Sequence, residues 1–395
     1  MKWTNRGNEN IPYKNIADMV KQNPAFCIYG AGQFGNELYG VLKKFDLFEC
    51  FIDNSVEKQK SGYNGEAVIS EAQFWKMYRS PKVRPFIVIA ASAANTRDIK
   101  ENLQEKGLIY GRDFFTFKEF INKVFPVIAY FVFGKTYVNL TQICVTERCS
   151  LKCKKCAHGC YAVKADHQDL TLEQVKKSAD AFFSKIDYIC EFVLIGGEPL
   201  LYRQLAEAVE YIGSKYRNKI NIFSITTNGT IKPSDRLLSV CREHDVLFRI
   251  SNYSKQLPRL ERQYSILSEL FNENGIRYSL GFQDSSWTDY GFEYVNRNGT
   301  EEELIKVFDS CDTPCHEIRE NKFYFCVMAR SVAENLSKNV GEDDYIDFDK
   351  LVSSDWKREL LEFILGYSQK GYLDMCNYCH GAECYKYPIP VAEQL

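Results

Sequence analysis

Five of the chain's 15 cysteines fall within residues 143–160, ICVTERCSLKCKKCAHGC. Among them Cys149, Cys153 and Cys156 form C-x3-C-x2-C, a spacing that can bring three thiolates to one side of a compact loop. Three thiolates are one fewer than a closed zinc site or a fully ligated four-iron cluster requires. The loop therefore predicts a metal site with one open coordination position.

The distribution of the remaining cysteines favours metal ligation over disulfides. Two cysteines precede residue 140, seven lie between residues 144 and 241, and six follow residue 310. The N-terminal stretch MKWTNRGNENIPYK is polar and has no apolar signal core, so we expect a cytoplasmic protein, in which thiols stay reduced. Clustered cysteines in such a protein are typical of metal sites.

Composition excludes several classes of function. The chain has 395 residues, which predicts two or three domains, and its 50 basic residues are balanced by 52 acidic ones. This balance gives no indication of a nucleic-acid-binding surface. The longest apolar run, Val124 to Phe133, is too short to span a bilayer, and we expect it to form a buried strand or a packing segment.

From Thr136 onward, apolar strand-like segments alternate with helical ones. The strand candidates are YVNLTQICV, EFVLIGG, INIFSITTNG, VLFRISNY and IRYSLGF. The helical segment Thr171 to Ile186 begins with a capping-box pattern, Thr171 followed by Gln174. Repeated βα units predict a parallel sheet, closed or partly closed by helices, with functional loops at the carboxyl ends of the strands. The cysteine loop leaves the first of these strands.

Further polar motifs follow the next three strands. They are Gly196-Gly197-Glu198-Pro199, then Thr226-Thr227-Asn228-Gly229, then Ser251-Asn252. Glycines permit close backbone approach, and a carboxylate such as Glu198 is a natural acceptor for an ammonium group.

Together these motifs resemble the radical S-adenosylmethionine (SAM) superfamily. The resemblance implies a 4Fe–4S cluster on Cys149, Cys153 and Cys156, whose fourth iron is chelated by SAM. It also implies SAM contacts from the motifs above, namely Gly196, Gly197, Glu198, Pro199, Thr227, Asn228, Ser251 and Asn252. One departure is Lys155, which stands where the family usually has an aromatic residue.

The activity implied by this resemblance is reductive cleavage of SAM to methionine and a 5′-deoxyadenosyl radical, which abstracts a hydrogen atom from a substrate. An electron donor such as flavodoxin or ferredoxin would then be a partner. The sequence assigns no catalytic base or hydrogen donor.

Six cysteines after residue 310 predict a second metal centre. HEIRENKFYF, between Cys315 and Cys326, has the pattern of a β-hairpin, and Cys376 with Cys379 adds a C-x2-C. This region resembles the twitch and SPASM extensions of radical SAM enzymes, which hold auxiliary clusters. We therefore expect one auxiliary 4Fe–4S cluster on Cys315, Cys326, Cys376 and Cys379, with Cys311 as a substitute for Cys315 and structural zinc as the alternative.

The first part of the chain carries a glycine pattern of a different kind. Gly30, Gly32 and Gly35 form G-x-G-x-x-G between a strand and a helix, and Asp53 ends the next strand. This context predicts a dinucleotide-type site, in which the glycines approach a pyrophosphate and the acid accepts a ribose hydroxyl. The alternative is that the glycines only pack the helix on the strand. The region also resembles small Rossmann-like modules that bind nucleotide-sugars in enzymes of glycan assembly.

The predicted fold is thus α/β. It has a Rossmann-like domain (1–123), a partial (β/α)6 radical SAM barrel (124–310) and a small twitch/SPASM-like iron–sulfur extension (311–395). The expected reaction is oxidation or epimerisation of a nucleotide-linked sugar or similar polar metabolite. Two alternatives stay open: a maturase that modifies a ribosomal peptide, and a non-catalytic iron–sulfur electron carrier or binding protein.

Overall fold

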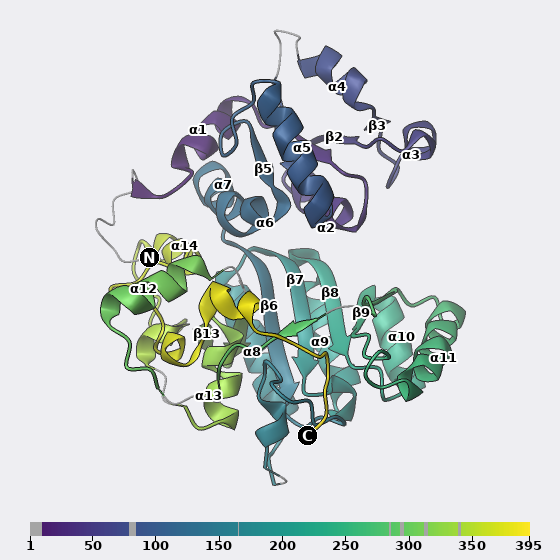
Figure 1. The fold of residues 1–395 in the computed structure, drawn as a ribbon, viewed down its shortest axis with the longest axis vertical. Coiled ribbons are helices and arrows are strands. Elements are labelled where there is room, and N and C mark those ends of the chain that lie inside the picture. The colour runs from purple at the N-terminus through teal and green to yellow at the C-terminus, as the bar shows by residue number, and fades with distance from the viewer. Residues whose placement is uncertain are drawn as a thin grey trace. The chain divides into compact units, whose positions relative to one another are not determined.

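The computed structural model describes residues 10–78, 84–164, 166–283, 286–292, 296–311, 315–338 and 341–395 (Figure 1). The chain divides into a first compact unit that ends at Asn139 and a second unit, Leu140–Leu395. Among the described residues, no helix is long and apolar enough to cross a membrane.

The first unit is built on a five-stranded sheet. Its strands are β1 (Phe26–Tyr29), β2 (Phe48–Ile52), β3 (Val68–Ile69), β4 (Phe86–Ile89) and β5 (Phe114–Thr116). They pair in the order β3-β2-β1-β4-β5, and every pair is parallel. The helices of this unit are α1 (Lys14–Gln22), α2 (Gln33–Lys44), α3 (Val56–Ser61), α4 (Glu71–Tyr78), α5 (Ala93–Glu105), α6 (Phe117–Glu119) and α7 (Phe125–Phe133). This strand order matches five of the six strands of the Rossmann order 3-2-1-4-5-6, so the unit is Rossmann-like, as expected.

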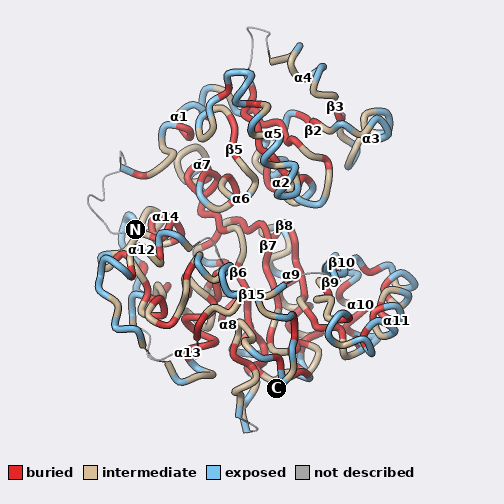
Figure 2. The backbone as a smooth tube through the Cα atoms, viewed as in Figure 1, coloured by how far each residue is buried: buried red, intermediate tan, exposed pale blue. Residues whose placement is uncertain are grey.

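Burial explains the composition of the central strands. Every residue of β1 and β4 is buried. Figure 2 shows the buried residues of each unit in red. A strand covered on both faces must be apolar throughout, which accounts for the unbroken runs FCIY and FIVI.

The apolar run that ends at Phe133 forms the helix α7 and the preceding π-helical segment Phe120–Val124, so the expectation of a strand is wrong. Pro126 lies in the first turn of α7, where its missing N–H costs no hydrogen bond. Five consecutive residues of α7 from Phe125 are buried. A helix that is buried on several sides has no polar face, and its sequence therefore lacks the helical period that would have identified it.

The second unit contains an eight-stranded sheet. Its first strands are β6 (Tyr137–Thr146), β7 (Tyr188–Gly196), β8 (Ile220–Thr227), β9 (Val246–Ile250) and β10 (Tyr278–Leu280). The helices between and after them are α8 (Leu172–Lys185), α9 (Leu205–Tyr216), α10 (Asp235–Glu243) and α11 (Arg259–Glu273). All five predicted strands are present, and the capping box of Thr171 and Gln174 opens α8. The α/β fold with a parallel sheet is confirmed.

Later segments extend this sheet on the side of its first strand. They are β12 (His316–Arg319), β13 (Lys322–Tyr324) and β14 (Tyr345–Asp347), and the sheet order is β10-β9-β8-β7-β6-β12-β13-β14. The predicted hairpin is β12–β13, with Glu320 in the left-handed region at its turn. Since β12 pairs parallel to β6, a sixth strand lies beside the first strand, and β10 is the edge strand among the described residues.

The remaining elements complete the second unit. They are β11 (Trp287–Thr288), β15 (Pro388–Ile389), α12 (Glu301–Ser310), α13 (Ser331–Asn335) and α14 (Trp356–Ile364). β11 and β15 pair antiparallel with each other in a small separate sheet.

A buried ionic cluster joins the start of the cysteine loop to the elements around β12. Arg330 is 1% exposed, and its guanidinium forms ion pairs with Glu147, just after β6, and with Glu317 on β12. Arg319 lies 3.4 Å from the same Glu147 carboxylate, and Asn335 donates to it at 3.0 Å. Burial alone would raise the pKa of Glu147, but Arg330 lowers it to about 2, so this carboxylate stays ionised at neutral pH.

We predict that Arg330→Met strongly destabilises the second unit, because it leaves buried Glu317 without its cation and Glu147 with only Arg319 at 3.4 Å. The expected loss of unfolding free energy is about 3–5 kcal/mol, measured by denaturant titration. The control is Lys177→Met, which removes a largely exposed ion pair with Glu320 and should cost no more than about 1 kcal/mol. Equal stability of the two variants would show that the buried cluster does not hold this unit together.

Candidate functional site

The cysteine loop follows β6 and places its three predicted ligands on one turn-rich segment. Cys153 is buried, whereas Cys149 and Cys156 are partly exposed. Nitrogen donors lie close to two of the sulfurs: Asn228 Nδ2 is 3.6 Å from Cys149 Sγ, and Gln394 Nε2 is 3.2 Å from Cys153 Sγ. Hydrogen bonds to sulfur are a feature of iron–sulfur sites.

The spacing of the sulfurs bears on the kind of metal that fits. Among the described residues, no three cysteine sulfurs lie within 4.8 Å of one another. Tetrahedral zinc, with Zn–S bonds of about 2.3 Å, would hold its sulfurs about 3.8 Å apart. The sulfurs are therefore not gathered closely enough for a mononuclear zinc site. Three thiols on one loop, with N–H donors to two of the sulfurs, are the donor chemistry of an iron–sulfur site with one open position.

Gly196 and Gly197, at the end of β7, let the cysteine loop pack against the sheet. A Cβ on Gly196 would lie 2.4 Å from the Thr146 carbonyl oxygen, and one on Gly197 would lie 2.8 Å from Cys149 Cβ. The backbone N–H of Gly197 also donates to Thr146 at 2.9 Å. Any larger residue would push Cys149 away from the strand ends. These glycines are therefore needed for packing within the protein, whether or not a ligand is bound.

Glu198 is fully buried and ties two loops together. Its carboxylate accepts hydrogen bonds from Thr227 Oγ1 and the Asn228 backbone N–H at 2.8 Å each, and from the Leu200 N–H at 3.1 Å. Burial raises the pKa of this carboxyl group. Pro199 is buried at the start of the short 3-10 helix Pro199–Leu201. The structure thus places the Glu198 carboxylate between the second and third strand ends.

A cavity of ≈ 320 Å³ lies where these strand ends meet the cysteine loop. Among the predicted residues it is lined by Cys156, Gly196, Gly197, Thr227, Asn228 and Ser251. The volume is within the usual range for small-molecule sites. Glu198 and Asn252 are absent from the lining, and Asn252 Oδ1 instead accepts hydrogen bonds from the Ser254 N–H and Oγ.

Side chains outside these motifs complete the cavity wall. Lys155, Tyr253, Trp287 and Tyr290 line it, and Lys155 Nζ lies 3.2 Å from a carboxylate oxygen of Asp289. Lys155 has a left-handed backbone, with φ 57. In the sequence, the tripeptide Trp-Thr-Asp beginning at Trp287 follows the fifth strand candidate. Its place after a strand is the only feature of the sequence that indicates a position near this cavity.

A second group of cysteines lies around an apolar cavity in the last part of the chain. Cys311, Cys326, Cys376 and Cys379 line it together with Phe308, Phe325, Met328 and Met375. Cys315 is not in the lining, and its sulfur instead lies 3.6 Å from Gln142 Oε1 on β6. The structure therefore groups three of the four predicted auxiliary ligands and replaces Cys315 by Cys311. Residue 315 directly precedes β12, whose pairing with β6 turns this sulfur toward the sheet.

The three glycines of the first unit have different surroundings. A Cβ on Gly30 would lie 2.4 Å from the Ala90 carbonyl oxygen, and one on Gly35 would lie 2.1 Å from the Gly30 oxygen. Gly32 has nothing within 4 Å of its Cβ position. Gly30 and Gly35 are thus needed for packing, whereas Gly32 leaves space beside the N-terminus of α2.

Asp53 is held against this glycine turn. Its carboxylate accepts hydrogen bonds from the backbone N–H groups of Ala31 at 2.8 Å and Ser55 at 2.9 Å, and Lys58 Nζ lies 3.5 Å away. Oδ2 thus faces both the Ala31 N–H and Lys58, whereas Oδ1 takes the Ser55 N–H and keeps capacity for a further donor.

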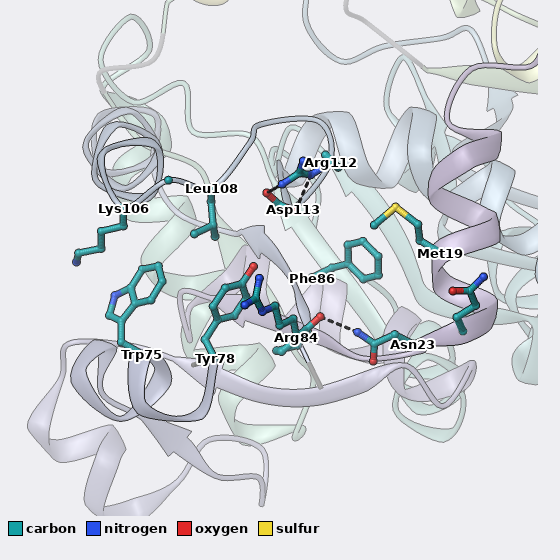
Figure 3. Close-up of a pocket in the computed structure, with 13 residues that line it drawn as sticks. Met19, Asn23, Trp75, Tyr78, Arg84, Phe86, Lys106, Leu108, Arg112 and Asp113 are labelled. Atoms are coloured by element: carbon teal, nitrogen blue, oxygen red, sulfur yellow. Dashed lines mark hydrogen bonds and ion pairs between the residues drawn. The ribbon is translucent and has the colours of Figure 1, made fainter. Parts of the chain in front are cut away.

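The first unit also contains a cavity of ≈ 670 Å³ (Figure 3). It is lined by residues that precede or begin β4 and β5, such as Phe86 and Asp113, whereas the glycine turn follows the carboxyl end of β1. Three of its charged side chains form ion pairs within the protein: Arg112 with Asp113 at 2.8 Å, and Lys106 with Glu71. It is thus distinct from the predicted nucleotide site.

Comparison with known proteins agrees with the cysteine loop and the motifs around it. Residues 143–251 match the family model of the Radical SAM superfamily. The chain is 30% identical to a GTP 3′,8-cyclase of Rhizobium etli over 98 residues, which are 25% of this chain and 27% of the relative. It is 33% identical to a GTP 3′,8-cyclase of Marinobacter nauticus over 102 residues, which are 26% of this chain and 29% of the relative. The match thus spans less than a third of these relatives.

Solved structures give a weaker likeness. The crystal structure of BtrN in complex with AdoMet and 2-DOIA is 17% identical, covers 64% of this chain and 98% of that chain, and superposes with a TM-score of 0.39. Streptococcus suis SuiB bound to S-adenosylmethionine is 16% identical, covers 56% of this chain and 49% of that chain, and has a TM-score of 0.31. The family match, which contains the C-x3-C-x2-C loop, thus identifies residues 143–251 as a radical SAM domain.

Proposed function

We propose that this chain is a radical SAM enzyme that abstracts a hydrogen atom from a nucleotide-linked sugar or a similar polar metabolite, leading to its oxidation or epimerisation. The observation that carries the proposal is the convergence of the cysteine loop, the Gly196-Gly197 pair and the loop at Asn228 on one cavity. An oxidoreductase or isomerase of this kind needs an electron donor such as flavodoxin or ferredoxin. All 15 cysteines are free of disulfides, which fits a reducing cytoplasm.

In this proposal, Cys149, Cys153 and Cys156 hold a 4Fe–4S cluster, and SAM lies in the adjoining cavity. When bound, the cluster and SAM supply the 5′-deoxyadenosyl radical that the superfamily uses. The protein's part is to position these groups. Thr227, Asn228 and Ser251 offer polar groups in the cavity wall, while Tyr253, Trp287 and Tyr290 contribute aromatic surface that limits access of water.

Glu198 acts within this site by fixing the loop geometry. Its three hydrogen bonds to residues 200, 227 and 228 hold the ends of β7 and β8 in register. A contact from this carboxylate to the SAM ammonium, as in the family, would require a rotation of the side chain toward the cavity.

The second cysteine group is proposed to hold an auxiliary 4Fe–4S cluster through Cys311, Cys326, Cys376 and Cys379. These four thiols share one apolar cavity, and four thiolates complete the ligation of such a cluster. An auxiliary cluster can accept an electron from the substrate. This favours oxidation over epimerisation as the reaction.

The first unit is proposed to bind the nucleotide portion of the substrate at the glycine turn. The open space at Gly32, the N-terminus of α2 and the adjacent Asp53 together provide room for a phosphate, N–H donors and an acceptor for a ribose hydroxyl. A peptide substrate is the principal alternative, and the nucleotide-binding experiment below distinguishes the two.

We predict that the anaerobically reconstituted protein forms 5′-deoxyadenosine from SAM when reductant is added, and that the triple variant Cys149→Ala, Cys153→Ala, Cys156→Ala forms none. The product is measured by mass spectrometry. Cys190→Ala, at a buried position outside both cysteine groups, serves as the control and should retain the activity. Wild-type protein that contains iron but neither binds nor cleaves SAM would contradict the proposed function.

For the auxiliary centre we predict that Cys311→Ala lowers the iron content of the reconstituted protein by about four atoms per chain, which is one 4Fe–4S cluster. Cys315→Ala is the matched control and should leave the iron content unchanged, because its sulfur lies outside the cavity. Iron and sulfide analysis of both variants measures this. The opposite pattern, with loss only in Cys315→Ala, would reverse the ligand assignment.

The glycine turn can be tested for nucleotide binding by substitution of Gly32. Gly32→Asp should weaken binding of a nucleoside diphosphate or nucleotide-sugar at least about tenfold, because a carboxylate is placed where a phosphate is expected. Gly32 has an extended backbone that any residue can adopt, so the melting temperature should change little. Isothermal titration calorimetry measures the affinity. If wild-type protein bound no nucleotide but did bind peptides, the substrate class would be wrong.

A further inference from the structure

Residues 387–395 form a strap beside the cysteine loop. β15 pairs with β11, so that Ile389 lies opposite Trp287, and the Asp289 N–H donates to the Tyr387 carbonyl at 2.9 Å. The strap then runs antiparallel to residues 152–154, where Gln394 lies opposite Cys153. In Figure 1 this yellow end of the chain crosses the teal part of the second unit.

Backbone hydrogen bonds hold the strap to the loop on both sides of Cys153. The Lys154 N–H donates to the Glu393 carbonyl at 2.7 Å, and the Leu395 N–H donates to the Lys152 carbonyl at 2.8 Å. These contacts join segments more than 230 positions apart in the sequence. Both hydrogen bonds flank one residue of the C-x3-C-x2-C motif, so the strap fixes the position of the Cys153 backbone.

Apolar packing accompanies these hydrogen bonds. Val391 and Ala392 are buried, and they form a small apolar cluster with Leu151 and Cys153, against which Trp287 packs. The strap therefore keeps water away from one side of Cys153, since its apolar side chains occupy that space.

The side-chain amide of Gln394 is oriented by three partners. Its Oε1 accepts the Lys152 N–H at 2.8 Å. Its Nε2 donates to Cys153 Sγ at 3.2 Å and to the Ala392 carbonyl at 2.7 Å. A flipped amide would place Oε1 against the carbonyl and the sulfur, and it would leave the Lys152 N–H facing an NH₂ group. The surroundings thus require that an N–H of Gln394 points at the sulfur.

We propose that Gln394 is a positioning residue that raises the reduction potential of the iron–sulfur cluster on Cys149, Cys153 and Cys156 by donating a hydrogen bond to the Cys153 sulfur. The inference rests on the proposed function, because it requires that cluster. Hydrogen bonds to sulfur and solvent exposure are among the determinants of cluster potentials. The reduced cluster carries one more negative charge, so an N–H donor stabilises the reduced state more than the oxidised one.

The test is an anaerobic redox titration of the reconstituted full chain without SAM, followed by electron paramagnetic resonance (EPR). The relevant signal is identified by its loss in Cys153→Ala. Gln394→Glu keeps the acceptor for the Lys152 N–H and replaces the donor by a carboxylate oxygen. It should lower the ratio of reduced to oxidised cluster about tenfold at a fixed potential, a shift of about 59 mV to more negative values for one electron. Gln394→Met, which has no donor and no charge, should shift the potential less in the same direction.

Glu393→Gln is the matched control. It removes only an exposed ion pair with Lys154 while the backbone hydrogen bonds of the strap remain, so the potential should stay at the wild-type value. Wild-type potentials in both Gln394 variants, at equal iron content, would overturn the inference. Loss of this cluster from both variants, but not from Glu393→Gln, would also overturn it, since Gln394 would then retain the cluster and not tune it. Absence of the Cys153-dependent signal from wild-type protein would instead refute the proposed function itself.

Discussion

The second unit depends on a positive charge buried beside the cysteine loop. Arg330 is almost fully buried, and such a charge is tolerated only if carboxylates surround it. Glu147 supplies one of them from the first residue after β6, and Glu317 supplies another from β12. Glu147 lies two positions before Cys149, so the same ion pairs that neutralise Arg330 also anchor the loop that carries the predicted ligands. The guanidinium of Arg330 thereby joins the cysteine loop to the C-terminal region.

Around this anchor, three further contacts bring separate loops to one cavity. The close packing of Gly196 and Gly197 sets the distance between the loop and β7, and Glu198 joins the ends of β7 and β8. The strap, with Gln394 opposite Cys153, holds the loop from the other side. The site is therefore preorganised by contacts among protein groups, and this is the condition under which a protein can position a reactive cofactor and exclude competing reactions.

The sequence predicted much of this arrangement because its signals are local. Strand patterns, the capping box at Thr171 and the C-x3-C-x2-C spacing each lie within a few residues, and the structure contains all of them. What the sequence could not predict comes from long-range contacts. The preference for Cys311 over Cys315 as an auxiliary ligand depends on how β12 pairs with β6, and no residue near either cysteine indicates that pairing. The strap and Arg330 depend on contacts of the same long-range kind. The helix α7 lacks a clear helical period because its first five residues are all buried.

We propose that the protein holds two distinct iron–sulfur centres and that only the centre on Cys149, Cys153 and Cys156 has an iron open to SAM. The most direct measurement is the EPR spectrum of the reduced, fully reconstituted protein before and after addition of SAM. We expect two cluster signals. One should change when SAM is added, while the other should stay the same because four cysteines complete the ligation of the second centre. Two signals that are both unchanged by SAM would show that neither centre has an iron open to it.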